Sequence, residues 1–165
     1  MYSSNPFLLI VVIFLNSLLS FSQKSDLKFY EVFNKSQNSK VSCYRIPSII
    51  TTDKGTLIAA ADERVLSCGD LKLNRDINIV IRTSNDEGKS WSSINRLVDY
   101  PFGESASDPS MIFDKKTKQI YLFYNYMNLE KDKDVYYLKY VTSLDNGITW
   151  SQPIDITDQI SKPEW

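Results

Sequence analysis

The sequence contains no histidine and only two cysteines among its 165 residues. The usual zinc sites take their ligands from cysteine and histidine, so this composition excludes them. The 19 lysines and arginines nearly balance the 20 aspartates and glutamates, which leaves a formal net charge of −1. A chain without excess positive charge is not expected to bind nucleic acid or an anionic membrane surface. We therefore predict no metal, no cofactor and no nucleic-acid partner.

The first 22 residues contain no charged side chain. Within them, the apolar run Phe7–Leu19 is shorter than the roughly 20 residues that a membrane-spanning helix needs. Ser20 and Ser22 then place small residues at the two positions that a signal peptidase reads. We predict a secretory signal that is cleaved before Gln23, so that the mature chain is secreted or periplasmic and has no stable membrane span. An uncleaved membrane anchor is the alternative.

Short apolar stretches separated by turn-forming residues predict an all-β chain without a long helix. The ten tyrosines and eight phenylalanines also favour strands. Pro47 interrupts the stretch 41–51 and predicts a short or edge strand there. Loops are expected at 62–76 and 101–107, and a helical turn near 157–161. The predicted strands are 26–34, 41–51, 56–61, 77–83, 110–113, 119–127 and 134–143, with a further strand beginning at Trp91.

One short pattern occurs twice in the chain. Ser84–Trp91 and Ser143–Trp150 share serine, aspartate, glycine, a hydroxyl residue and tryptophan in the same register. The pattern is typical of a β-turn, in which aspartate accepts backbone N–H groups and glycine adopts a positive φ. Since short strands precede each turn, the repeat predicts blades of a β-propeller. The repeated residues are Ser84, Asp86, Gly88 and Trp91 in the first turn and Ser143, Asp145, Gly147 and Trp150 in the second.

The Tyr-Arg-Ile-Pro sequence at 44–47 resembles the motif that opens the catalytic domain of sialidases. The two repeated turns resemble the Asp boxes of the same enzymes, particularly the secreted bacterial ones. The resemblance implies an incomplete propeller over 41–165, about two blades of a six-bladed β-propeller of the sialidase type, after a lead-in strand and loop at 23–40. The other matching segments are 61–64, Asp70, 76–80, 107–109, 155–158 and 163–165.

The resemblance also implies roles for individual residues. Arg45 would belong to the arginine cluster that holds the carboxylate of sialic acid, because guanidinium groups bind carboxylates through paired hydrogen bonds. Asp70 would be the general acid/base at the glycosidic oxygen, with Asp76 as the second-ranked candidate. Arg64 would reach O4 of the sugar. Asp108 would lie at the pocket floor, near O4 and the N-acetyl group. The substrate would be a sialylated glycan.

The implied reaction is retaining hydrolysis of terminal sialic acids by a tyrosine nucleophile. That tyrosine, its glutamate partner and the remaining arginines belong to later blades of such a propeller, beyond Trp165. We therefore expect the chain to be inactive alone and to need the missing blades as its partner. Two alternatives stay open. One is a sialic-acid-binding propeller without catalysis, and the other is a propeller glycosidase that acts on another sugar.

Each cysteine precedes a candidate site residue by two positions. Cys43 precedes Arg45, and Cys68 precedes Asp70. Residues two apart in a strand face the same side of a sheet, so the cysteines lie close together if Arg45 and Asp70 share a pocket. An exported chain can form a disulfide between them. The alternative is a pair of small buried thiols.

Overall fold

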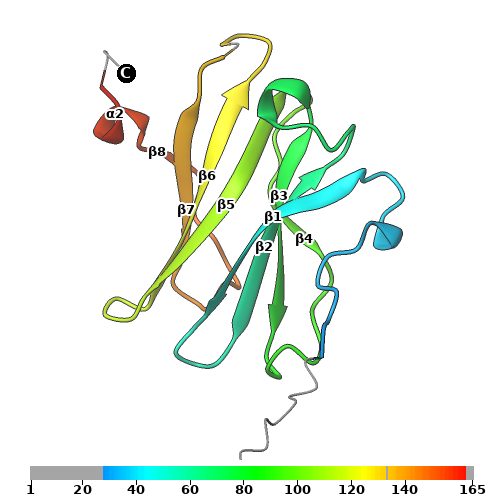
Figure 1. Cartoon of the computed structure of the whole chain (residues 1–165). Helices are drawn as coiled ribbons and strands as arrows, with labels where there is room; N and C mark the ends of the chain where they lie inside the picture. The colour runs from blue at the N-terminus through cyan, green and yellow to red at the C-terminus, as the bar shows by residue number, and fades with distance from the viewer. Residues whose placement is uncertain (1–27, 133, 163–165) are drawn as a thin grey trace, which may run out of the picture.

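The computed structural model describes residues 28–132 and 134–162, which form two four-stranded antiparallel sheets (Figure 1). The first sheet has the order β1-β2-β3-β4 and the second has the order β5-β6-β7-β8, so within each sheet consecutive strands of the chain pair with each other. The all-β prediction is confirmed. The predicted signal at 1–22 and the motif at 163–165 lie outside the described residues.

The strands are short to medium in length, and the helical elements are single turns. The helical elements are η1 (Lys35–Gln37), η2 (Leu71–Leu73) and α2 (Thr157–Ile160). The last of these confirms the predicted helical turn. The strands are β1 (Cys43–Thr51), β2 (Leu57–Arg64), β3 (Ile77–Ser84), β4 (Asn95–Val98), β5 (Glu104–Asp114), β6 (Gln119–Asn128), β7 (Tyr137–Ser143) and β8 (Ile154–Asp155).

The strand predicted at 26–34 is wrong over its described part, which contains no strand. Asn34 instead caps η1, because its side-chain oxygen accepts a hydrogen bond from the backbone N–H of Ser36 at 2.8 Å. The segment is held by a side chain from the first sheet, since Arg82 Nη1 donates to the carbonyl of Val32 at 2.6 Å. A side-chain anchor of this kind leaves no periodic pattern in the sequence.

The loop predicted at 101–107 is correct over 101–103 and wrong from Glu104, where β5 begins. Ser105, Ala106 and Ser107 are buried and pair with β6. Their small side chains let the two sheets approach each other closely. Strand propensity reflects such packing more than any intrinsic preference of the backbone.

Two further boundaries differ from the prediction. β2 continues to Arg64, inside the stretch 62–76 that was expected to be a loop. The strand expected to begin at Trp91 is β4, which begins at Asn95. Trp91 stays with the turn before it, because its indole N–H donates to the carbonyl of Gly88 at 3.1 Å.

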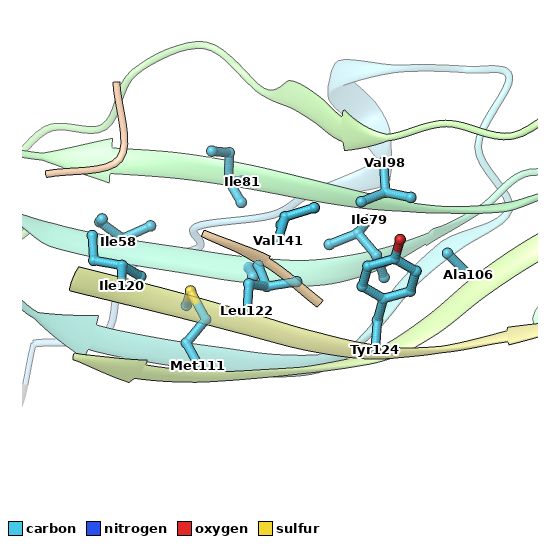
Figure 2. Close-up of a cluster of buried hydrophobic side chains, with 11 residues drawn as sticks. Ile58, Ile79, Ile81, Val98, Ala106, Met111, Ile120, Leu122, Tyr124 and Val141 are labelled. Atoms are coloured by element: carbon cyan, nitrogen blue, oxygen red, sulfur yellow. The ribbon is translucent and has the colours of Figure 1, made fainter. Parts of the chain in front are cut away.

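The two sheets pack against each other around one apolar core (Figure 2). Successive strand residues point to opposite faces, so alternate residues of each central strand face the other sheet. Figure 2 shows these side chains gathered between the strands. The core therefore joins the sheets into one body. Its buried members include Ile58, Ala60, Ile79 and Ile81 from the first sheet and Ile120, Leu122, Tyr124 and Val141 from the second.

The two repeated turns have the same internal hydrogen bonds, which confirms the repeat. In the first, Ser84 Oγ donates to Asp86 Oδ1 at 2.8 Å, and the same carboxyl oxygen accepts from the backbone N–H of Ser90 at 2.9 Å. The second turn reproduces both bonds with Ser143, Asp145 and Thr149, each at 2.8 Å.

The glycines of the two turns also have the same backbone conformation, since Gly88 and Gly147 adopt φ values of 84° and 85°. Each sheet thus carries one such turn after its third strand.

Candidate active site

The first strand of each sheet is interrupted by a bulge at a residue that precedes a proline. The pairing of β1 with β2 shifts between Arg45 and Ser48, and that of β5 with β6 shifts between Ser107 and Ser110. Residues before proline normally adopt extended conformations. Ile46 and Asp108 instead have φ values of 50° and 63°.

Backbone outliers of this kind cluster at functional sites. Ile46 and Asp108 line one pocket of about 340 Å³. The pocket is lined also by Arg45 from β1, Asp70 from the loop after β2, and Tyr136 from the loop before β7. The structure therefore brings together Arg45, Asp70 and Asp108, which the sequence predicts to share a site.

Asp70 lies between two arginines. Its carboxyl oxygen Oδ1 accepts from Arg64 Nη1 at 2.6 Å and from Arg45 Nη1 at 3.3 Å. The side chain of Asp70 is 76% exposed and that of Arg45 is 45% exposed, so both are open to solvent. The hydrogen bond and the positive charge of Arg64, followed by the charge of Arg45, lower the pKa of Asp70. Asp70 is therefore a carboxylate at neutral pH in this arrangement.

Arg64 is not among the residues that line the pocket. Its side chain is 1% exposed and lies beneath Asp70. Its Nε and Nη2 donate to Asp62 Oδ2 at 3.2 and 2.8 Å. Its Nη1 donates to the carbonyls of Cys68 and Gly69 at 3.0 and 2.9 Å as well as to Asp70. Arg64 thus links a buried carboxylate to an exposed one.

Asp62 is a functional candidate that the sequence analysis missed. It is fully buried, and besides Arg64 it accepts from Ser107 Oγ at 2.6 Å and from the backbone N–H of Asp108 at 2.9 Å. These bonds join β2 of the first sheet to the bulge in β5 of the second. The only sequence signal for Asp62 is its place in the matching segment 61–64, and Ser107 lies likewise in the segment 107–109.

Asp76 is not brought to the pocket. Its carboxyl oxygen Oδ1 accepts from Asn78 Nδ2 at 3.2 Å, and its backbone carbonyl accepts from the N–H of Val65 at 3.1 Å. Asp108 does reach the pocket, where its Oδ2 accepts from Asn125 Nδ2 at 3.0 Å. Tyr136 also lines the pocket, and no sequence pattern singled it out.

The two cysteines form a disulfide, so the first of the two alternatives holds. The Cα atoms of Cys43 and Cys68 lie 5.8 Å apart, and the bond closes a separation of 25 residues. It connects the start of β1 to the loop that carries Asp70.

A larger hollow, of about 620 Å³, lies on the opposite face of β2. Its arginines are already engaged. Arg82 donates to the backbone carbonyls of Val32, Trp91 and Ser92, and Arg96 pairs with the buried Glu63. The smaller pocket offers the exposed guanidinium and carboxyl groups that acid–base chemistry on a sugar needs.

Within residues 28–132 and 134–162, no group of three or more metal-binding side chains lies close enough together to hold an ion. Over the same described ranges, no helix is long and apolar enough to cross a membrane.

The sequence-family model for the BNR repeat-like domain matches residues 54–164, which is more than half of the chain. The chain belongs to the BNR repeat-like domain family. It is 29% identical over 144 residues to a sialidase of Bacteroides fragilis, a match that covers 75% of this chain and 26% of that protein. It is 33% identical over 117 residues to an anhydrosialidase of Macrobdella decora, covering 58% of this chain and 15% of that protein.

A solved structure of the Hadza microbial sialidase Hz136 matches this BNR repeat-like chain with a TM-score of 0.69 at 27% identity. The match covers 77% of this chain and 28% of the other. The resemblance to sialidases that the motifs predict is confirmed, and the two sheets correspond to part of a sialidase propeller. The chain spans about a quarter or less of the length of the two curated relatives described above.

Proposed function

We propose that this chain supplies one part of the active site of an exo-α-sialidase. Such an enzyme removes terminal sialic acids from glycoproteins, glycolipids and oligosaccharides with retention of configuration. One observation carries the proposal: the guanidinium of Arg45 and the carboxyl of Asp70 meet in an open pocket that Asp108 also lines. The similarity to named sialidases supports it.

The pairing of Arg45 with Asp70 suggests how binding prepares the acid. A sialic acid carboxylate attracts the Arg45 guanidinium, which forms its best hydrogen bonds with planar carboxylates. As Arg45 turns towards the substrate, Asp70 loses the smaller part of the positive charge that lowers its pKa. Its pKa then rises, which favours the protonated form that donates to the leaving glycosidic oxygen. Arg64, which is the stronger partner, keeps Asp70 in place.

Asp108, Arg64 and Asp76 are the other residues to which the sequence assigns a role in the site. Asp108, which is anchored by Asn125, would meet the sugar near O4 and the N-acetyl group. Contact between Arg64 and O4 stays a prediction, and the buried guanidinium of Arg64 supports a second part in holding Asp70. Asp76 stays second in rank because it does not line the pocket.

The proposed whole enzyme needs groups from outside this chain. A tyrosine nucleophile, its glutamate partner and further carboxylate-binding arginines would come from later blades, so this chain alone should release no sialic acid. The sialylated substrate would be met outside the cytoplasm if the predicted signal peptide at 1–22 directs export.

The proposal is tested with the full-length protein that contains this chain and a fluorogenic sialoside. We expect sialic acid release by the full-length protein and none by the 165-residue chain. Asp70→Asn should lower kcat at least about 100-fold, the usual contribution of general acid–base catalysis. Asp76→Asn is the matched control. If Asp76→Asn lowers kcat more than Asp70→Asn does, Asp76 is the general acid/base and Asp70 is not.

The same assay separates the two alternatives. If the full-length protein binds sialylated glycans but never cleaves them, it is a sialic-acid-binding propeller. If it cleaves neutral glycosides as well as sialosides, it is a glycosidase of another kind. Arg45→Lys keeps the charge but loses the paired hydrogen-bond geometry. It should raise KM for sialosides only if Arg45 binds a carboxylate.

A further inference from the structure

We propose that the Cys43–Cys68 disulfide is a positioning element of the pocket, which holds Arg45 and Asp70 in register while substrate is bound. Reduction of this bond would then disable the site. The inference rests on the proposed function and adds a redox requirement to it.

The disulfide lies close in the chain to both site residues, Arg45 and Asp70. Cys43 is the first residue of β1, and Arg45 follows it by two positions. Cys68 lies in the loop after β2, and Asp70 follows it by two positions. The crosslink therefore fixes the backbone on either side of the pocket, within two residues of each functional group.

The backbone carbonyls of Cys68 and Gly69 accept hydrogen bonds from arginines. The carbonyl of Cys68 accepts from Arg45 Nη1 and from Arg64 Nη1, both at 3.0 Å. The carbonyl of Gly69 accepts from Arg64 Nη1 at 2.9 Å. The amide side chain of Asn74 adds one bond, to the carbonyl of Ser67 at 2.7 Å. Among these contacts, Arg45 provides the only hydrogen bonds from β1 to the loop.

Arg45 cannot keep its hydrogen bonds to the loop and bind a substrate carboxylate at the same time. When its guanidinium turns to a substrate carboxylate, its bonds to the Cys68 carbonyl and to Asp70 weaken. The disulfide then remains as a covalent connection between β1 and the loop, beside the hydrogen bond at 2.8 Å from Ser42 Oγ, just before β1, to the carbonyl of Val65. An approaching substrate carboxylate does not weaken the covalent bond. This is why a covalent bond is useful here, where the ion pair between Arg45 and Asp70 must be loosened during each catalytic cycle.

Reduction needs an external dithiol, such as dithiothreitol. One thiolate of the reagent attacks a cysteine sulfur, breaks the S–S bond and forms a mixed disulfide. The second thiol of the reagent then displaces the protein sulfur. The products are two protein thiols and the cyclic disulfide of the reagent, so that two electrons and two protons pass to Cys43 and Cys68.

The kinetic test uses the full-length protein with and without dithiothreitol, and the double variant Cys43→Ser/Cys68→Ser. We expect kcat for a fluorogenic sialoside to fall at least about tenfold on reduction or substitution, because small displacements of catalytic groups are costly. The limb of the pH–rate profile that belongs to Asp70 should move to higher pH as Asp70 loses its arginine neighbours. Dithiothreitol should not affect the double variant further.

A reduced wild type that keeps both its kcat and its pH profile would overturn the proposal. If the double variant does not fold, the reduced wild type alone decides the question. If the oxidised protein releases no sialic acid, the proposed function fails, and amide exchange tests the disulfide separately. The amide of Leu73 donates to the carbonyl of Asp70 at 2.7 Å and should exchange at least about tenfold faster after reduction.

The amides of β3 are the internal control for this exchange experiment, because they lie in the core sheet. Their exchange should be unchanged on reduction. Equal exchange of Leu73 in the oxidised and reduced proteins would contradict a positioning role for the disulfide, whatever the enzyme's activity.

Discussion

A single buried carboxylate connects most of the candidate site. Asp62 accepts hydrogen bonds from Arg64, from Ser107 and from the backbone of Asp108, and these partners lie in both sheets. Arg64 in turn holds Asp70. At the scale of residues, the pocket is therefore built on a network whose centre never meets solvent.

The first prediction concerns the loss of this buried charge. Asp62→Asn leaves the buried guanidinium of Arg64 without its charged partner in the interior. Removing one member of a buried pair costs about 3–5 kcal/mol, and we expect a fall of that size in the free energy of unfolding, measured with urea. Asp99→Asn is the control, because Asp99 forms an exposed pair with Arg96 and should change stability by less than about 1 kcal/mol. Similar losses for both variants would contradict the argument.

The second prediction concerns the Asp-box carboxylates and pH. Hydrogen bonds from Ser90 and Ser84 lower the pKa of Asp86 to about 2, and those from Thr149 and Ser143 lower the pKa of Asp145 to about 2, from an ordinary value of 3.8. A group with a lowered pKa in the folded state stabilises the fold above its unfolded-state pKa. That contribution is lost as the pH falls from 3.8 towards 2.

The test compares urea midpoints of the wild type and of Asp86→Asn at about pH 5 and about pH 3. The wild type should be the more stable protein at the higher pH, and the difference should shrink at the lower pH. An equal difference at both values would show that the carboxylate charge of Asp86 does not stabilise the turn.

At the scale of elements, the two Asp boxes are alike in their bonds and different in their surroundings. A Cβ atom added at Gly147 would lie 2.6 Å from Cδ1 of Ile58, a core residue of the other sheet. At Gly88 the nearest atom would be Cδ1 of Leu57, at 3.4 Å. The second turn is therefore part of the contact between the sheets.

The third prediction uses this difference. Both glycines adopt positive φ, so Gly88→Ala and Gly147→Ala each incur the left-handed strain of about 1–2 kcal/mol. Gly147→Ala also forces Ile58 out of its place, and such overpacking costs about 1–3 kcal/mol more. We expect the larger loss of unfolding free energy for Gly147→Ala in denaturant titrations. Equal losses would mean that Ile58 moves aside without cost.

At the scale of the whole molecule, the shared core makes the two sheets one cooperative unit. Leu122 is fully buried between them, whereas Ile112 of β5 is 55% exposed. The fourth prediction is that Leu122→Ala lowers the free energy of unfolding by about 2–5 kcal/mol. Ile112→Ala should change it by less than about 0.5 kcal/mol.

Cooperativity is checked with the tryptophans, because Trp91 lies between β3 and β4 of the first sheet and Trp150 between β7 and β8 of the second. Fluorescence of the variants Trp91→Phe and Trp150→Phe, each combined with Trp165→Phe so that one tryptophan remains, should report the same urea midpoint in the Leu122→Ala background. Two separate midpoints would show that the blades unfold independently.

Much of the fold was predictable from local sequence. The Asp boxes were found because the serine and aspartate hydrogen bonds that define each turn lie within eight consecutive residues, Ser84–Trp91 and Ser143–Trp150. The edge position of β1 followed from Pro47, which has no N–H to donate. β5 was placed too late because the burial of Ser105 and Ser107 depends on the facing sheet.

The candidate site was predictable only in part. Arg45, Asp70 and Asp108 were recognised through short motifs, and the structure does bring them together. Asp62 was missed because its importance comes from partners in the other sheet. Asp76 was ranked as a candidate because loop sequence alone does not show which way a carboxylate points.

The sequence by itself determined most of the strands, the repeated turns and the kinship with sialidases, because each depends on residues that are close together in the chain. Tertiary structure decided that Cys43 and Cys68 are bonded, that Arg64 is buried and that Asp62 joins the two sheets. The physical reason is distance along the chain. Asp62 and Ser107 are 45 residues apart, and only packing of the sheets brings them within a hydrogen bond.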